Sequence, residues 1–132
     1  MPWMEQAYLL QRKALDDSNA LNRLVGDPTI VDAIVGFHAQ QACEKALKAV
    51  LASRTVAYPR THNLRVLRDL LIDDGLPIPM EVDDSLILSS FGAQFRYDDP
   101  PDGGFDRAEA VRLVTGVLAW CDSQVEAASS NA

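Results

Sequence analysis

The chain has 132 residues, of which 48% are hydrophobic and 23% are charged, and these proportions are those of one globular domain and exclude a disordered chain. The net charge is −7, and its acidic excess lies in the second half: residues 1–66 hold 8 basic and 6 acidic residues, whereas residues 67–132 hold 4 and 13. Because nonspecific nucleic-acid binding depends on a basic surface, this balance argues against generic DNA binding. No apolar run approaches the roughly 20 residues that a bilayer requires, and no secretory signal is visible, so we expect no membrane association.

Hydrophobic residues recur at helical spacing along the chain, and no segment alternates as a strand would. The spacing, with its capping and proline signals, predicts four helices over 4–25, 28–54, 80–98 and 105–127. A further helix is predicted between the second and third of these, with Thr61 as its cap and Asp73-Asp74-Gly75 at its end. Two prolines and two glycines within residues 98–104 exclude regular structure there. We therefore predict an all-α, up-and-down bundle of four to five helices, with one domain over 1–128 and a frayed tail over 129–132.

The two cysteines, Cys43 and Cys121, both lie in apolar helical patterns, and nothing near them resembles a metal-ligand pair. Buried, reduced thiols and a cytoplasmic location fit this pattern. Asp16, Asp17 and Asp32 do not form a defensible triad of metal ligands either. We therefore expect no metal and no cofactor.

The second predicted helix is apolar around well over half of its circumference, which indicates that it lies centrally in the bundle. Its small residues, among them Ala39, Ala42 and Ala46, would let neighbouring helices approach closely. The remaining arc is polar and holds His38, Gln40, Gln41, Glu44, Lys45 and Lys48.

Two interpretations of this polar arc are open. In the first it is a solvated face, on which Glu44 and Lys48 form an i,i+4 ion pair worth about 0.2–0.5 kcal/mol. In the second it floors a groove in which Gln41, Lys45 and Lys48 offer hydrogen-bond donors to an anionic or nucleotide ligand. The spacing of the residues does not decide between them.

Three segments of the sequence resemble a known family. The first is FHAQQACEKALKAVL at 37–51, the second is PRTHNLRVL at 59–67, and the third is the pair Arg96-Tyr97 at the end of an aromatic-rich segment. Together they resemble the HEPN domain (higher eukaryotes and prokaryotes nucleotide-binding). The resemblance implies an up-and-down helical bundle, usually a homodimer. It also implies a minimal nucleotidyltransferase as partner subunit and a role in a toxin–antitoxin or stress-response module.

The ribonuclease branch of this family carries an arginine followed, after four to six residues, by a histidine, which supplies a cation and a general acid or base. Here Arg96 is followed by Tyr97 and then by a segment without histidine, because His38 and His62 both precede it. The acidic residues that follow Arg96 would also repel an incoming phosphate. We therefore assign no catalytic residue and expect a binding module instead of an independent enzyme.

The candidate nucleotide- or phosphate-binding residues are Gln41, Lys45, Lys48 and Arg96. The residues expected to support them structurally are His38, Glu44, His62 and Tyr97. Arg96 can serve either as an anion contact or as a structural partner that reaches back to Glu44. Two alternatives to the nucleotide-binding module stay open: a metal-independent ribonuclease toxin and a purely structural interaction subunit.

Overall fold

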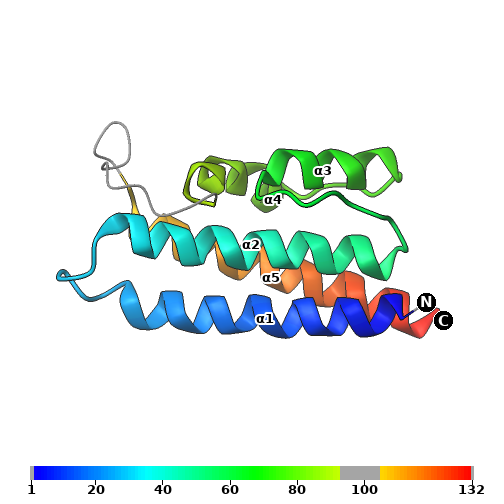
Figure 1. The fold of residues 1–132 in the computed structure, drawn as a ribbon, viewed down its shortest axis with the longest axis horizontal. Helices are drawn as coiled ribbons and strands as arrows, with labels where there is room; N and C mark the ends of the chain where they lie inside the picture. Colours follow the sequence, from blue (N-terminus) through cyan, green and yellow to red (C-terminus); the bar gives the residue numbers. More distant parts are fainter. Residues whose placement is uncertain (1, 93–104, 132) are drawn as a thin grey trace.

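The computed structural model describes residues 2–92 and 105–131, and within these ranges it contains helices and no strand. The elements are α1 (Trp3–Leu24), α2 (Asp32–Ser53), α3 (Leu64–Asp73), α4 (Met80–Ser85), the 3-10 helix η1 (Leu86–Phe91) and α5 (Arg107–Ser130). The long helices α1, α2 and α5 run side by side, and α3, α4 and η1 lie on the side of α2 that is away from α1 (Figure 1). The predicted all-α bundle is confirmed.

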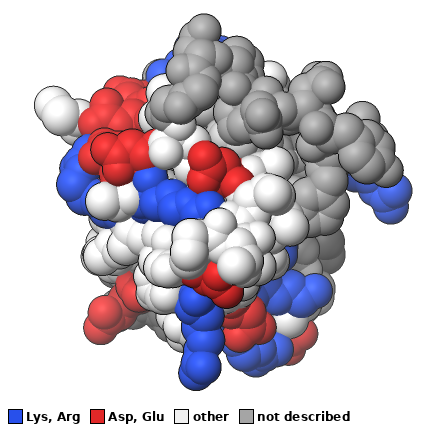
Figure 2. Space-filling view, turned by 90° about the vertical axis from the view of Figure 1, so that its left-hand side faces the viewer, with Lys and Arg blue, Asp and Glu red and all other residues white. Residues whose placement is uncertain are grey.

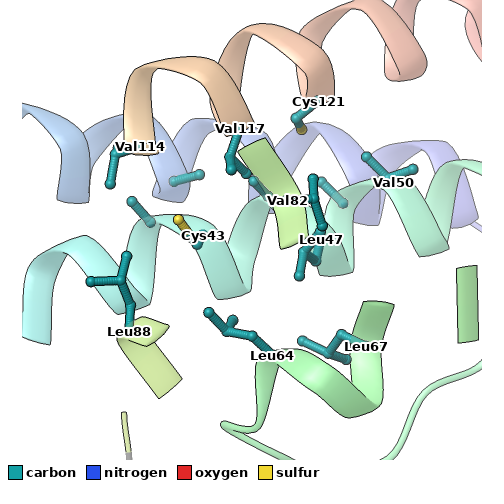
Figure 3. Close-up of a cluster of buried hydrophobic side chains, with 14 of the residues drawn as sticks. Cys43, Leu47, Val50, Leu64, Leu67, Val82, Leu88, Val114, Val117 and Cys121 are labelled. Carbon is teal, nitrogen blue, oxygen red and sulfur yellow. The ribbon is translucent and has the colours of Figure 1, made fainter. Parts of the chain in front are cut away.

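Helix α2 is the centre of the bundle, as its apolar circumference predicted. It packs against α1, α3, η1 and α5, and most of its residues are buried. Leu47 of α2 lies between Leu67 of α3 and Val117 of α5 in the hydrophobic core, and Val50 is buried one turn further along α2 (Figure 3). α2 is therefore the element against which most of the fold packs.

Two glycines allow the end of η1 to pack directly on α2. A Cβ atom at Gly36 would come within 2.5 Å of the Phe91 ring, and one at Gly92 would come within 2.5 Å of the Gln40 amide. Both distances are far shorter than a real carbon contact, so a side chain at either position would displace the Phe91 ring or the Gln40 amide from its place. Gly92 thus brings the backbone at the end of η1 onto a buried polar residue of α2.

The first turn predicted for the second helix is not helical, and α2 begins at Asp32 instead of residue 28. The Asp27 carboxylate accepts hydrogen bonds from the backbone N–H and the hydroxyl of Thr29, at 2.9 and 2.6 Å. These bonds hold Pro28 and Thr29 in a turn and compete with helix formation.

The cap predicted at Thr61 is also wrong by two residues. The side chain of Asn63 caps α3 by accepting from the N–H of Arg65 at 2.9 Å, whereas the Thr61 hydroxyl accepts from the N–H of Asn63 at 3.0 Å. The N–H of Leu64, at the start of α3, donates to the hydroxyl of Ser89 in η1 at 3.0 Å. The start of α3 is thus fixed by a contact with a distant segment.

The single helix predicted over 80–98 is α4 followed by the tighter helix η1. The buried hydroxyl of Ser85 donates to the carbonyl of Val82 at 2.6 Å, at the point where the helix type changes. Residues 93–98 of that prediction, and the loop predicted over 98–104, lie outside the described residues. At the other end of the chain, α5 is capped by Asp106 and continues to Ser130, three residues beyond the predicted end.

Arg107, the first residue of α5, fastens the connection between α1 and α2. Its guanidinium donates to the carbonyls of Val25 and Asp27 at 3.2 and 3.1 Å and to the carbonyl of Ile30. It also pairs with the Asp32 carboxylate at 2.9 Å. One guanidinium group therefore binds carbonyls at the end of α1 and along the connection to α2.

Both cysteines are buried free thiols, as predicted. Burial raises the pKa of Cys43 and of Cys121 to about 12, so neither thiol ionises at neutral pH. No helix in residues 2–92 and 105–131 is long and apolar enough to cross a membrane. Within the same ranges, no group of three His, Cys, Asp or Glu side chains is placed to hold a metal ion.

Candidate functional site

The polar arc of α2 lies between α1 on one side and the segment 54–63 on the other, and it divides into two clusters of side chains. One cluster surrounds the carboxylate of Glu44, and the other surrounds the carboxylate of Asp17, which projects from α1. We call the first the Glu44 cluster (Gln40, Gln41, Glu44, Lys48 and His62) and the second the Asp17 cluster (Asp17, His38 and Lys45).

The Glu44 carboxylate is only 4% exposed and accepts hydrogen bonds on both oxygens. Its Oε2 accepts from Lys48 Nζ at 2.9 Å. Its Oε1 accepts from Gln40 Nε2 at 3.1 Å and from His62 Nδ1 at 2.9 Å. Because a carboxylate can only accept, Nδ1 of His62 carries the proton in this contact.

Two glutamines extend the Glu44 cluster into a network in which every buried group is satisfied. Gln40, which is fully buried, also donates from Nε2 to the backbone carbonyl of His62 at 2.8 Å. Gln41 donates from Nε2 to Gln40 Oε1 at 2.8 Å. No buried side-chain nitrogen or oxygen of the described residues lacks a hydrogen-bond partner. The network holds the segment before α3 against the middle of α2.

The charge state of Glu44 follows from a balance of opposing effects. Burial raises the pKa of the carboxyl group, but hydrogen bonds from Lys48, Gln40 and His62 outweigh it, and the net pKa lies below the ordinary value. Glu44 is therefore ionised at neutral pH, and its negative charge neutralises the positive charge of Lys48.

The Asp17 cluster joins α1 to α2 through a carboxylate that is paired with a lysine and a histidine, as in the Glu44 cluster. Lys45 Nζ lies 2.5 Å from Asp17 Oδ2, and His38 Nδ1 lies 3.1 Å from Asp17 Oδ1. The His38 ring also meets the Phe37 ring edge-on, with 5.6 Å between the ring centroids. His38 therefore contacts both α1 and its neighbour Phe37, and its supporting role stays a prediction.

The solvent-facing edge of the Glu44 cluster is made by a histidine and a lysine. The side chain of His62 is 55% exposed, although its Nδ1 is held by the buried carboxylate. The Lys48 side chain is 15% exposed, and its Nζ lies 5.7 Å from the centroid of the Tyr58 ring. The cluster therefore presents an oriented imidazole and an ammonium group beside an aromatic ring.

The structure brings together only part of the predicted ligand set. Gln41 and Lys48 share the Glu44 cluster, whereas Lys45 belongs to the Asp17 cluster. Arg96 and Tyr97 lie outside the described residues. Both lysines are already paired with carboxylates, so an anionic ligand has to compete for them.

Sequence reasoning missed two residues of this site, Asp17 and Tyr58. Asp17 contacts residues that follow it by 21 and 28 positions, and Tyr58 meets Lys48 from the segment after α2. No local spacing rule connects positions this far apart, so only the packing of α1 and of the segment 54–63 on α2 reveals them.

Some acidic and basic side chains outside the two clusters also form ion pairs, among them Arg54 with Asp74 and Arg68 with Asp83. At the end of the bundle where α1 connects to α2, acidic and basic side chains lie side by side on the described surface (Figure 2). The pair of Arg107 and Asp32 lies at this connection. On this face the described acidic and basic side chains alternate, and they form no continuous basic patch of the kind that a nucleic-acid backbone requires.

The sequence model of the HEPN domain matches residues 7–124. This chain belongs to the HEPN family. The structure is also similar to the crystal structure of ST0689, an archaeal HEPN homologue, with a TM-score of 0.52 and 20% sequence identity over 94% of this chain and 95% of that one. At this identity the likeness concerns the fold alone. No curated protein matches the chain. Membership of the HEPN family supports a nucleotide-binding or ribonuclease-type module.

We predict that Glu44→Ala lowers the free energy of unfolding by about 3–5 kcal/mol at pH 7, because it leaves Lys48 and two polar groups without their acceptor. Since the folded-state pKa of Glu44 is below its ordinary 4.5, its contribution is present above that pH and is lost as the pH falls through the folded value. Urea unfolding of both proteins between pH 3 and pH 7 measures this difference.

The matched control is Glu126→Ala, because Glu126 is an exposed residue of α5. We expect its effect to stay within about 0.5 kcal/mol at each pH. A Glu44→Ala effect below about 1 kcal/mol at pH 7, or one equally large at pH 3, would contradict the role of the buried carboxylate.

Proposed function

We propose that this chain is a nucleotide- or phosphate-binding module that acts as a homodimer together with a minimal nucleotidyltransferase subunit, in a toxin–antitoxin or stress-response module. The observation that carries the binding role is the Glu44 cluster, in which a buried carboxylate holds an exposed His62 and a Lys48 whose side chain is 15% exposed. The partner subunit, the homodimer and the module are proposed from the family resemblance.

The energetics of buried charges support a role beyond folding. Replacing a buried ion pair by apolar side chains of similar volume is often neutral or stabilising by about 1–4 kcal/mol. A helix at the centre of a bundle therefore does not need Glu44 and Lys48 in order to pack. Their presence, with two glutamines and a histidine arranged around them, supports selection for what the cluster presents to solvent.

The chemistry of the exposed edge suits a phosphate group. Lys48 supplies a compact positive charge, and His62 has a second ring nitrogen that points away from the Nδ1 contact with Glu44. A phosphate that binds here replaces one half of the Lys48–Glu44 pair, so we expect affinity in the micromolar to millimolar range. Lys45, and Arg96 from outside the described residues, are the further cations proposed for this ligand.

We predict that ATP binds the folded chain and that Lys48→Ala weakens this binding at least tenfold, because the variant removes the ammonium group of the Glu44 cluster. Isothermal titration calorimetry measures both affinities. Lys13→Ala is the control, since Lys13 is exposed on α1, and it should bind ATP as the unaltered chain does. Circular dichroism checks that both variants are folded.

Two results would reject the proposal. The first is the absence of heat at millimolar ATP with folded, unaltered protein. The second is an unchanged affinity in folded Lys48→Ala, which would place the ligand away from the Glu44 cluster.

A ribonuclease is the second candidate, and the contact between His62 and Glu44 favours it. A carboxylate that holds Nδ1 orients the ring so that the other nitrogen can exchange a proton with substrate. If the chain cleaves RNA, we predict that His62→Ala abolishes cleavage while His38→Ala, which alters the Asp17 cluster only, retains it. Gel analysis of labelled RNA incubated with concentrated protein tests this, and intact RNA after prolonged incubation would dismiss the enzyme.

A further inference from the structure

A cavity of about 320 Å³ opens where the start of α1 meets the segment that follows α2. It is lined by Pro2, Trp3, Gln6, Ala57 and Tyr58. Two of these five residues are aromatic, and Gln6 supplies an amide that can both donate and accept hydrogen bonds. The volume lies at the lower end of the range of about 300–1,000 Å³ that small-molecule sites occupy.

Tyr58 links this cavity to the Glu44 cluster. Gln6 Nε2 donates to the Tyr58 hydroxyl at 3.4 Å, which ties the ring to α1. Lys48 Nζ lies 5.7 Å from the centroid of the same ring, and it is also the donor to Glu44 Oε2. The Tyr58 ring therefore contacts both the cavity and the ammonium group that is proposed to bind phosphate.

We propose that this cavity is the base subsite of the nucleotide site: it takes the nucleobase of a mononucleotide between Trp3 and Tyr58, while the phosphate reaches Lys48. The inference rests on the proposed nucleotide-binding function and adds a site for the nucleobase, which the Glu44 cluster does not bind.

The chemistry of the lining determines how selective the subsite is. Stacking of a base on an aromatic side chain is worth about 1–3 kcal/mol, and it tolerates any base because each has a π face. The polar side-chain groups of the lining are the Gln6 amide, the Tyr58 hydroxyl and the Trp3 indole N–H. The subsite therefore requires a base but discriminates weakly among bases.

The experiment compares adenosine monophosphate with ribose 5-phosphate, which carries the same sugar and phosphate without the base. The chain has two tryptophans, so Trp120→Phe leaves Trp3 as its one fluorescent indole. We expect the monophosphate to change Trp3 emission in a saturable way and to bind at least tenfold more tightly than ribose 5-phosphate. Calorimetry on the unaltered chain with the same two ligands gives the affinities independently of the Trp120 variant.

Variants of Tyr58 test whether the base binds in this cavity. Tyr58→Ala should weaken binding of the monophosphate at least fivefold, while Tyr58→Phe, which keeps the ring, should bind it nearly as well as tyrosine does. Tyr8→Ala is the control, because Tyr8 lines a different cavity between α1 and α5.

The outcomes separate the base subsite from the function on which it rests. Equal affinities for the two ligands, with no change in Trp3 emission, would overturn the subsite and leave the phosphate site standing. Unchanged affinity in folded Tyr58→Ala would overturn the subsite as well. Absence of binding by both ligands would overturn the subsite and the proposed function together.

Discussion

The arrangement of this domain around its candidate site depends on one buried carboxylate. Glu44 lies in the middle of the central helix, where a charge without partners would be costly, and it is satisfied by donors from α2 and from the segment before α3. Gln40 adds a bond to the His62 backbone, and Gly92 lets the end of η1 approach the same glutamine. One network of hydrogen bonds therefore positions His62, Lys48, the segment before α3 and the end of η1.

The local pattern of the sequence predicted what α2 is, and long-range contacts decided what it touches. The apolar circumference of the helix predicted its central place. The ion pair of Glu44 and Lys48 was expected only if the arc was a solvated face, whereas the structure has this pair with Glu44 buried. The residues that complete the two clusters, His62 and Asp17, come from segments whose approach depends on the packing of the whole bundle. The sequence could therefore nominate the polar arc as a site, but it could not divide the arc into two clusters.

The errors in helix boundaries have the same origin. Asp27 holds the segment before α2 in a turn, Asn63 takes the cap expected of Thr61, and Ser85 marks the change from α4 to η1. Aspartate, asparagine, serine and threonine all compete with helical hydrogen bonds, so their presence predicts a boundary but not the residue at which it falls. The residue at which the helix begins is decided by contacts with distant segments. An example is Ser89, whose hydroxyl accepts from the N–H of Leu64, the first residue of α3.

Nitrogen NMR of the His62 imidazole tests the central claim most directly, because it reports which ring nitrogen carries the proton. At a pH where the ring is neutral, the contact with Glu44 predicts that the proton resides on Nδ1, and that Glu44→Leu returns the ring to the mixture in which Nε2–H prevails. A ring that already carries its proton on Nε2 in the unaltered protein would show that the buried carboxylate does not hold His62, and the account of the site would fail with it.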